Sequence, residues 1–448
     1  MPASLGRIVG LCAIAALAVG AAPVRKIQYT DSRLKNGLRV IISEDHAAPV
    51  FAIVVNYNVG SRDERKGRTG FAHLFEHMMF KGSENVGPGE HPYLMFMYGG
   101  SMNGTTNKDR TLYYEVLPSN QLDLALFLEA DRMRSLDITK ENLDNQRNAV
   151  QEERRLGVDN QPYGKTFETI DELAYENFAY EHSVIGSMED LGAATVDDVA
   201  SFFKTYYAPN NAVVSIVGDV DAKATLDKVR KYFEDIPSQP APPEVDMTEP
   251  KQTEERRTTL EDPLARLPRL DMAYKIPPAG SPDSDALSVL GTVLSGGRSS
   301  RLYESIVRQQ QLSSGVSAGA AQSRGPGLFR VIGTPLPGKT PAELEAAIEA
   351  EIAKVQSQPI ADWELEKARN AARSSFINGL QSALNRAIQL SENALAYDDP
   401  ARINTRADEI AKVTAADVQR VAKEYLVKTN RTVVETLPKA AAPKGVQK

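Results

Sequence analysis

A proline-rich segment divides this sequence nearly in half. Residues 236–257 read IPSQPAPPEVDMTEPKQTEERR, with five prolines, many charges and no periodic apolar positions. Such a composition is typical of a linker between domains. At roughly 100–200 residues per domain, a chain of 448 residues is expected to hold two to three domains. We therefore predict one domain over residues 23–235 and a second over residues 258–438.

The two halves offer strands and helices in a similar order. Runs rich in β-branched residues predict strands, and apolar residues at helical spacing predict helices. In the first half we expect strands at 38–42, 51–57 and 212–217 and helices at 69–80, 121–134, 142–156 and 222–233. In the second half we expect strands at 269–274, 327–333 and 431–437 and helices at 285–294, 342–355, 363–390 and 415–426. Element order agrees more clearly than residue identity, which indicates a diverged internal duplication of a mixed α/β unit.

The N-terminus has the pattern of a secretory signal peptide. Arg7 precedes an apolar run over Ile8–Ala18, and small residues follow it. The alternative is an uncleaved membrane anchor, but the run is shorter than the roughly 18–20 apolar residues that span a bilayer. The only cysteine, Cys12, lies in this run, so a mature chain would have no disulfide. We predict a signal peptide at residues 1–22, a flexible tail at residues 439–448, and a periplasmic protein without a stable membrane span.

Composition and residue order argue against several other functions. The formal charge is −7, so the chain lacks the basic excess that binding to nucleic acid would require. Residues 315–319 match the G-x-S-x-G pattern of serine hydrolases, whose catalytic histidine must follow the serine, yet the last histidine is His182. His182, His46 and His91 each stand alone in the sequence and are interpreted as surface or loop residues.

Chemically useful side chains are concentrated in one predicted helix. His73 and His77 flank Glu76 in the segment TGFAHLFEHMMF, which matches the pattern H-x-x-E-H. At about 100° per residue the three side chains share one face of the helix. Two imidazoles one turn apart can hold a Zn²⁺ ion, and the carboxylate beside them can act on a water molecule. The spacing predicts a metal-dependent hydrolase, and the alternative is an amphipathic helix that carries two histidines without binding a metal.

With these residues the sequence resembles the pitrilysin/insulinase family of inverted-motif zinc peptidases, and most of all its mitochondrial-processing-peptidase-type branch. The resemblance covers nearly the whole mature chain. It implies an α+β fold with two similar α/β domains, each a mainly antiparallel sheet packed with helices, that form half of a peptidase clamshell. It also implies a zinc-dependent endopeptidase for short or unfolded peptides, with Glu76 as the catalytic base. The alternative is a non-catalytic scaffold subunit, whose hallmark would be an eroded H-x-x-E-H motif; the motif is intact here.

The resemblance also implies a third zinc ligand. In the family a glutamate ends a helical segment that commonly reads E-R-x-V-V-x-x-E, and QRNAVQEE at 146–153 fits that frame. Glu153 therefore takes the place of the ligand, and Glu152 is expected to point elsewhere. Gln146 replaces the glutamate that usually starts the segment. It keeps a hydrogen-bonding group but no charge, and we expect it to orient a zinc ligand by hydrogen bonding to that ligand without contacting the metal.

A second family feature is the pattern G-G-x-x-N-A-x-T before a strand. This chain has GGSMNGTT at 99–106, followed by a predicted strand at 110–114. In the proteins that the chain resembles, that strand lies at a sheet edge near the metal and pairs with an extended substrate. The resemblance thus implies substrate contacts at Asn103, Gly104 and Thr105. The alternative is an ordinary strand after a glycine turn, with Asn103 as a turn residue.

The family resemblance finally implies a dimer, because the working clamshell has four related domains and this chain supplies two. In dimeric relatives the second domain carries an arginine and a tyrosine in the pattern R-x-x-x-G-L-A-Y, and both help to hold the substrate carbonyl. Here Arg308 is present, but Gly315 stands where the tyrosine is expected. We therefore predict a heterodimer in which a paralogous subunit supplies the Arg/Tyr pair and this chain bears the zinc. The alternative is a homodimer in which Tyr303 or another residue substitutes, or in which no tyrosine is needed.

Overall fold

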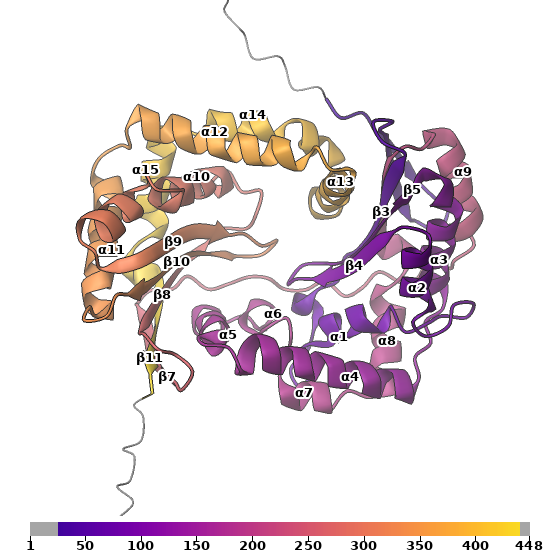
Figure 1. Cartoon of the computed structure of the whole chain (residues 1–448), viewed down its shortest axis with the longest axis horizontal. Helices are drawn as coiled ribbons and strands as arrows, with labels where there is room; N and C mark the ends of the chain where they lie inside the picture. Colours follow the sequence, from indigo (N-terminus) through magenta and orange to yellow (C-terminus); the bar gives the residue numbers. More distant parts are fainter. Residues whose placement is uncertain (1–25, 440–448) are drawn as a thin grey trace, which may run out of the picture.

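The computed structural model describes residues 26–439, which form two sheets with helices on both faces of each (Figure 1). The predicted signal peptide lies outside the described residues, as does the predicted tail after Lys439. Within the described range, no helix is both long enough and apolar enough to cross a membrane.

The first sheet has six strands in the order β1-β2-β6-β3-β5-β4. Its strands are β1 (Thr30–Arg33), β2 (Arg39–Glu44), β3 (Val50–Tyr57), β4 (Ser101–Thr106), β5 (Thr111–Pro118) and β6 (Ala212–Gly218). Only β2 and β6 run parallel, and all other neighbours are antiparallel. The predicted strands at 38–42, 51–57 and 212–217 are confirmed. β6 is buried over its whole length because it has a strand on each side and helices on each face.

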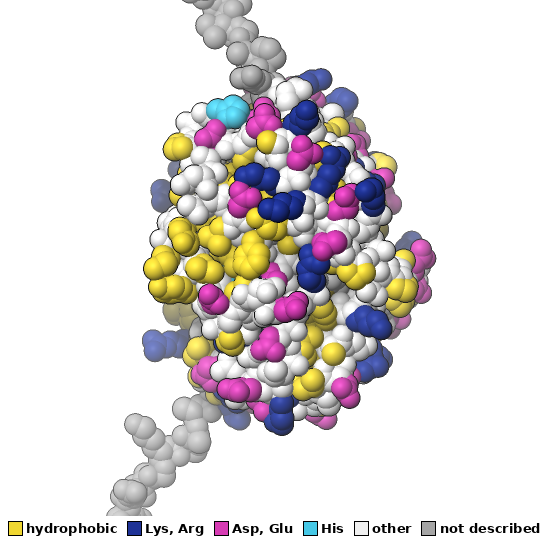
Figure 2. Space-filling view, turned by 90° about the vertical axis from the view of Figure 1, so that its right-hand side faces the viewer, with side chains coloured by type: hydrophobic (Ala, Val, Ile, Leu, Met, Phe, Trp, Pro, Cys, Tyr) yellow, Lys and Arg dark blue, Asp and Glu magenta, His cyan; other side chains and the backbone are white. Residues whose placement is uncertain are grey.

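Helices of the first half cover one face of this sheet and form the larger core with it. They are α1 (Phe71–Met78), α2 (Glu90–Met97), α3 (Leu122–Arg134), α8 (Val196–Tyr206) and α9 (Ala222–Phe233). α4 (Lys140–Arg154) packs against α1 and continues into a π-helical turn, η3 (Arg155–Asp159). The remaining short elements are η1 (Ser61–Asp63), η2 (Ser119–Gln121), α7 (Met188–Gly192) and η4 (Pro209–Asn211). Figure 2 looks at the side of the molecule where α2, α3 and α9 lie.

The second sheet has five strands in the order β7-β11-β8-β10-β9. They are β7 (Arg256–Asp262), β8 (Arg269–Ile276), β9 (Ser313–Ala321), β10 (Gly327–Pro335) and β11 (Arg431–Pro438). β7 runs parallel to β11, and the other neighbours are antiparallel. This sheet therefore repeats the order and directions of β2-β6-β3-β5-β4, as the predicted internal duplication requires. Its inner face packs against α10 (Ser284–Ser295), α11 (Pro341–Ser357) and α15 (Ala415–Tyr425).

The proline-rich segment ends earlier than the sequence suggests. Residues 236–255 form no helix or strand, but Arg256 and Arg257 already pair with β11 as the first residues of β7. The sequence RRTTLED contains a single apolar residue and alternates between exposed and half-buried positions. Its strand was missed because edge strands of this kind need no apolar run.

The second face of each sheet is covered by helices from the other half. α13 (Ala383–Tyr397) leaves the second half and packs on β3 and β6, where Leu390 joins the buried Ile41 and Val54. In return, α5 (Gly164–Ala174) and α6 (Phe178–Glu181) of the first half cover the second sheet, where Ile170 lies in one cluster with Val434. The two predicted domains therefore share two of their four apolar clusters.

The single helix predicted at 363–390 is two helices in the structure. α12 (Asp362–Gly379) ends before a short turn, and α13 begins after Ser382, whose side chain accepts a hydrogen bond from Asn385 N. The turn lets the chain cross from the second half to the first sheet, and η6 (Pro400–Asn404) and α14 (Arg406–Lys412) lead it back. The remaining elements of the second half are η5 (Tyr303–Gln309) and η7 (Lys428–Asn430).

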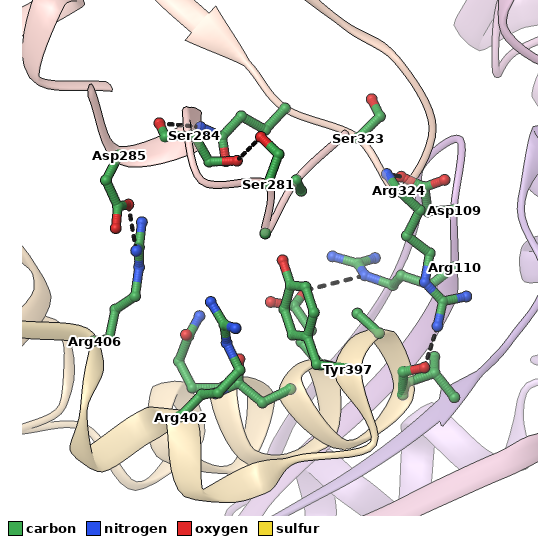
Figure 3. Close-up of a pocket in the computed structure, with 18 of the residues that line it drawn as sticks. Asp109, Arg110, Ser281, Ser284, Asp285, Ser323, Arg324, Tyr397, Arg402 and Arg406 are labelled. Atoms are coloured by element: carbon green, nitrogen blue, oxygen red, sulfur yellow. Dashed lines mark hydrogen bonds and ion pairs between the residues drawn. The ribbon is translucent and has the colours of Figure 1, made fainter. Parts of the chain in front are cut away.

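A polar cavity of about 530 Å³ lies where the two halves meet, and the turn after β4 forms part of its wall (Figure 3). Asp109 in this turn accepts a hydrogen bond from Arg324 N of the second half at 2.9 Å. Arg110 bridges the halves as well, since its guanidinium lies 3.3 Å from Glu392 on α13 and donates to Thr105 O on β4 at 2.8 Å. These contacts fasten the edge strand of the first sheet to the second half.

Because the two halves exchange helices, we expect the stability of the whole protein to depend on the packing of α13. Leu390 is fully buried, so Leu390→Ala should lower the free energy of unfolding by about 2–4 kcal/mol, measured by urea denaturation. The matched control is Trp363→Ala on α12, where the side chain is 56% exposed and the expected change is below about 0.5 kcal/mol. Equal effects of the two substitutions would contradict the packing of α13 on the first sheet.

Candidate metal centre

The start of α1 is fixed by a glycine and a buried carboxylate. Gly70 precedes the helix at φ 84°, and a Cβ there would lie 2.6 Å from Ile185 O. The carboxylate of Glu64 accepts hydrogen bonds from Gly70 N at 2.9 Å and Ala72 N at 2.7 Å. It thereby satisfies two backbone N–H groups that have no partner inside the helix. α1 is thus held at the end that precedes both histidines.

His182 belongs to this support: it lies in a loop after α6, as one of its two predicted interpretations has it, but it is buried and not on the surface. Its side chain is buried, and Nε2 lies 3.0 Å from Glu64 Oε2. Burial is the largest single influence and lowers the pKa of His182, but the hydrogen bond to Glu64, the charge of Glu64 and the hydrogen bond to the backbone of Phe178 together outweigh it, so the pKa is raised. Glu64 and His182 are 118 positions apart in the sequence. Only the fold brings them together, so no local pattern could reveal the pair.

The structure brings His73, His77 and Glu153 to one point between α1 and α4. Glu153 Oε2 lies 3.6 Å from His73 Nε2 and 3.3 Å from His77 Nε2. In a tetrahedral zinc site with ligand atoms about 2.1 Å from the ion, two such atoms are about 3.4 Å apart. Two imidazole nitrogens and a carboxylate oxygen at these separations fit a zinc ion in both geometry and donor type.

The protonation states of the cluster also suit a metal. Burial, and then the neighbouring His77, lower the pKa of His73 to about 4, so its imidazole is neutral at neutral pH. The hydrogen bond from His77 lowers the pKa of Glu153. Neutral imidazoles and an ionised carboxylate are the forms that bind divalent cations. His73 Nδ1 is buried without a hydrogen-bond partner among residues 26–439.

Glu76 lies between this cluster and strand β4. Thr106 Oγ1 donates a hydrogen bond to Glu76 Oε2 at 2.6 Å. A Cβ on Gly104 would lie 2.9 Å from Glu76 Cγ, so the glycine leaves the room that the glutamate side chain fills. Burial raises the pKa of Glu76. Thr106 was not among the site residues predicted from the sequence, although it ends the glycine-containing pattern at 99–106.

The edge strand next to the cluster is β4, which corrects the assignment of that place to residues 110–114. Residues 111–114 belong to β5, which is paired on both sides, with β3 and with β4, and Arg110 lies in the turn before it. The outer edge of β4 has no neighbouring strand within the described residues. Residues 101–106 were not predicted as a strand because SMNGTT is polar and contains glycine. Asn103 and Thr105 are exposed on β4, and the side chain of Asn103 accepts a hydrogen bond from Gly104 N at 2.9 Å.

Two other predicted residues do not contact the cluster. Gln146 is buried on α4, but its amide donates to Asn145 Oδ1 at 2.5 Å, and within the described range it forms no hydrogen bond to a proposed ligand. The orienting contact expected of it is therefore not formed. Arg308 lies on η5 with its side chain 71% exposed, and its ion pair is with Glu304 at 3.0 Å. Glu152 forms an ion pair with Arg155 at 3.0 Å and is not part of the cluster of His73, His77 and Glu153.

A second group of potential ligands lies in the core, and it corrects the interpretation of His91. His91 is buried, and its Nε2 lies 2.6 Å from Glu115 Oε1, while Glu129 completes the group. Arg132 already supplies the cation here, because its Nε donates to Glu129 at 2.9 Å and its guanidinium stacks on Tyr113. We interpret this group as a buried ion-pair network that joins α2, β5 and α3.

The fold and the cluster of His73, His77 and Glu153 together place this chain in the class of inverted-motif (H-x-x-E-H) metallopeptidase folds. Residues 39–187 match the family model described as insulinase (peptidase family M16), and residues 193–372 match the model described as the peptidase M16 inactive domain. All three candidate ligands and Glu76 lie within the first match. The chain belongs to peptidase family M16.

Relatives and solved structures agree with this assignment. The chain is 30% identical over 441 residues to a protein named zinc protease PqqE from Helicobacter pylori, covering 97% of this chain and 99% of that protein. A crystal structure of a protease from Helicobacter pylori matches with a TM-score of 0.88 at 30% identity, covering 92% of this chain and all of that one. The periplasmic protease PqqL from Escherichia coli shares the fold at 17% identity and a TM-score of 0.75, and the match covers only 50% of its chain.

The low pKa of His73 predicts a pH-dependent stability of the zinc-free protein. Between pH 6.5 and 4 the unfolded chain binds a proton at His73 that the native protein does not bind. The free energy of unfolding should therefore fall as the pH falls, with a contribution of up to about 1.4 kcal/mol per pH unit. His73→Asn removes this contribution and should give a shallower slope in urea denaturation at pH 7 and pH 5 with chelator present. Identical slopes would show that His73 is not buried as a neutral side chain.

Proposed function

We propose that this chain is a zinc-dependent endopeptidase that hydrolyses short or unfolded peptides. The observation that carries the proposal is the convergence of His73, His77 and Glu153, with Glu76 and an open sheet edge beside them. The similarity to proteins named zinc proteases supports it. Bound zinc would supply a Lewis acid that activates water and polarises the scissile carbonyl.

In this proposal Glu76 acts as the catalytic base and then as the acid. Its carboxylate accepts a proton from the attacking water and later passes it to the leaving amine. Thr106 holds Oε2, whereas Oε1 has no hydrogen-bond partner among the described residues and is free to exchange the proton. The raised pKa of Glu76 makes the carboxylate a stronger base than an exposed glutamate.

The substrate is proposed to pair with β4 as an additional strand. Backbone groups of Asn103, Gly104 and Thr105 would bind an extended peptide beside Glu76. Backbone pairing reads little side-chain sequence, and a folded protein cannot offer an extended strand. This is why we propose short or unfolded peptides as substrates.

The proposed working form is a heterodimer. Arg308 is exposed, and within the described residues its ion pair is with Glu304 and not with the candidate metal cluster; Gly315 on β9 provides no hydroxyl. A paralogous subunit that carries both an arginine and a tyrosine would complete the site of this chain. We also propose that residues 1–22 export the chain, so that it acts in the periplasm. A homodimer remains the alternative, and full activity of the isolated zinc-loaded chain, unchanged when the paralog is added, would contradict the heterodimer.

A second candidate function, that of a non-catalytic subunit, is suggested by the description of one matching domain. Residues 193–372 match a domain described as inactive. Because this region contains none of the proposed ligands, the match agrees equally well with an active first half and a second half without a metal site. Zinc content and chelator-sensitive cleavage distinguish the two functions.

Substitutions of the proposed base and of a proposed ligand should have different effects on zinc binding and on cleavage. Glu76→Gln should retain one zinc per chain but lower kcat by about 10²–10⁴-fold, because it removes the proton acceptor and leaves the ligands. His77→Ala should lose both zinc and cleavage. Zinc content by atomic absorption and cleavage of a quenched fluorescent peptide provide the measurements. Normal cleavage by purified Glu76→Gln protein would refute this mechanism.

Neighbouring glutamates on α4 provide a matched test of the third ligand. Glu153→Ala should weaken zinc binding by more than about 100-fold. Loss of a residue that only hydrogen-bonds to a metal ligand already lowers metal affinity by about 10–100-fold. Glu152→Ala removes the same group one position away and should leave zinc affinity unchanged. Competition titrations with a chromophoric chelator measure both affinities, and a reversed order would move the third ligand to Glu152.

A further inference from the structure

Four large apolar side chains are exposed together on α2 and at its C-terminal end. We call them the α2 patch: Tyr93, Phe96, Met97 and Tyr98, which are 58%, 66%, 61% and 45% exposed. They account for four of the ten large hydrophobic side chains that are exposed within the described residues. Figure 2 shows hydrophobic side chains gathered on the side of the molecule where α2 lies. Gathered apolar side chains of this kind mark binding surfaces more often than scattered ones do.

The exposure of the α2 patch does not come from a loosely held helix. His91 and Met95, one turn apart, are buried and anchor the opposite face of α2. Tyr93, Phe96 and Met97 are spaced as neighbours on a helix surface, so they form one stripe that faces away from the core. A helix that is apolar on both faces normally has a partner on each. Within residues 26–439, the outer face of α2 therefore lacks one.

The chain itself ties the α2 patch to the proposed active site. Gly104, which lies against Glu76, is six positions after Tyr98, and six steps of extended chain span at most about 21 Å. The real separation is shorter, because the glycine turn folds back and Gly100 N donates to Met95 O at 2.8 Å. A peptide paired with β4 would therefore reach the α2 patch within about six residues of the bond beside Glu76.

The strand offers this peptide little apolar contact of its own. Ser101, Asn103 and Thr105 are the exposed side chains of β4, and all are small or medium-sized and polar. Among the exposed large hydrophobic side chains of residues 26–439, those of the α2 patch are the nearest to β4 along the chain. The continuity of α2 with the open edge of β4 is what identifies the peptide as the occupant.

We propose that the α2 patch binds a large apolar or aromatic side chain of the peptide substrate, several residues away from the scissile bond. The inference rests on the proposed function and adds a substrate preference to it. The contact is made equally in the bound substrate and in the transition state, so it lowers KM more than it raises kcat. It makes the protein selective for unfolded chains that carry an apolar residue at a set distance from the cleaved bond.

The test compares peptides that differ in one residue. Quenched fluorescent peptides carry either Phe or Ser at each position from three to six residues from the cleaved bond, on either side. With the zinc-loaded full chain, we expect kcat/KM to be about tenfold higher for Phe at one of these positions. The double variant Phe96→Ser/Met97→Ser should bring this ratio close to one. The control Trp363→Ser removes an equally exposed aromatic side chain from α12 and should keep the ratio.

A binding measurement separates this inference from the proposed function. In Glu76→Gln protein, fluorescence anisotropy should show about tenfold tighter binding of the preferred Phe peptide than of its Ser counterpart, and the double variant should abolish the difference. This readout needs no cleavage, so a protein that binds selectively but never cleaves would refute only the proposed function. An unchanged preference in the double variant would overturn the inference. The inference would also be overturned if the double variant lost a dimer but kept the preference for Phe, because the α2 patch would then be a contact between subunits.

Discussion

The packing of α4 across α1 is the contact on which the candidate site depends. Two ligands one turn apart on α1 are a local property of the sequence, but the third must come from another element. On α4 the buried Leu143, Gln146 and Val150 recur at the spacing of one helix face, and Glu153 continues that face by one more turn. The apolar stripe that packs α4 against the core therefore also decides that Glu153 lies beside the histidines and Glu152 does not.

The exchange of helices makes the two halves one structural unit. Separating them would expose the face of the first sheet that α13 covers and the face of the second sheet that α5 covers. The edge strand benefits from this, because Asp109 and Arg110 tie its far end to Arg324 and to α13. A peptide that pairs with β4 therefore meets a strand that is held at both ends, by the glycine turn from α2 and by the contacts between the halves. Such a strand needs little ordering when a peptide binds.

Much of the fold and of the metal cluster was predictable from the sequence, because both depend on local periodicity and on a compact motif. The buried central strands and the helix that carries His73 and His77 are predictable because their apolar residues recur at strand or helix spacing. The elements that were missed or misplaced lack this signal: β4 and β7 are polar edge strands, and the break between α12 and α13 is set by what α13 covers. The pairs of His182 with Glu64 and of His91 with Glu115 are long-range, and an isolated histidine in a sequence does not reveal that it is buried.

The two carboxylates of the site have environments that move their pKa values apart, and this difference supports the roles proposed for them. Burial raises the pKa of Glu76, and the hydroxyl of Thr106 only partly offsets it. Glu153 is more exposed, and its hydrogen bond with His77 lowers its pKa. A carboxylate that stays ionised is suited to hold a cation, whereas one with a raised pKa is the better proton acceptor and is suited to acid–base catalysis. In the proposed mechanism the same residue type therefore serves two functions, and differences in burial and hydrogen bonding match each glutamate to its proposed role.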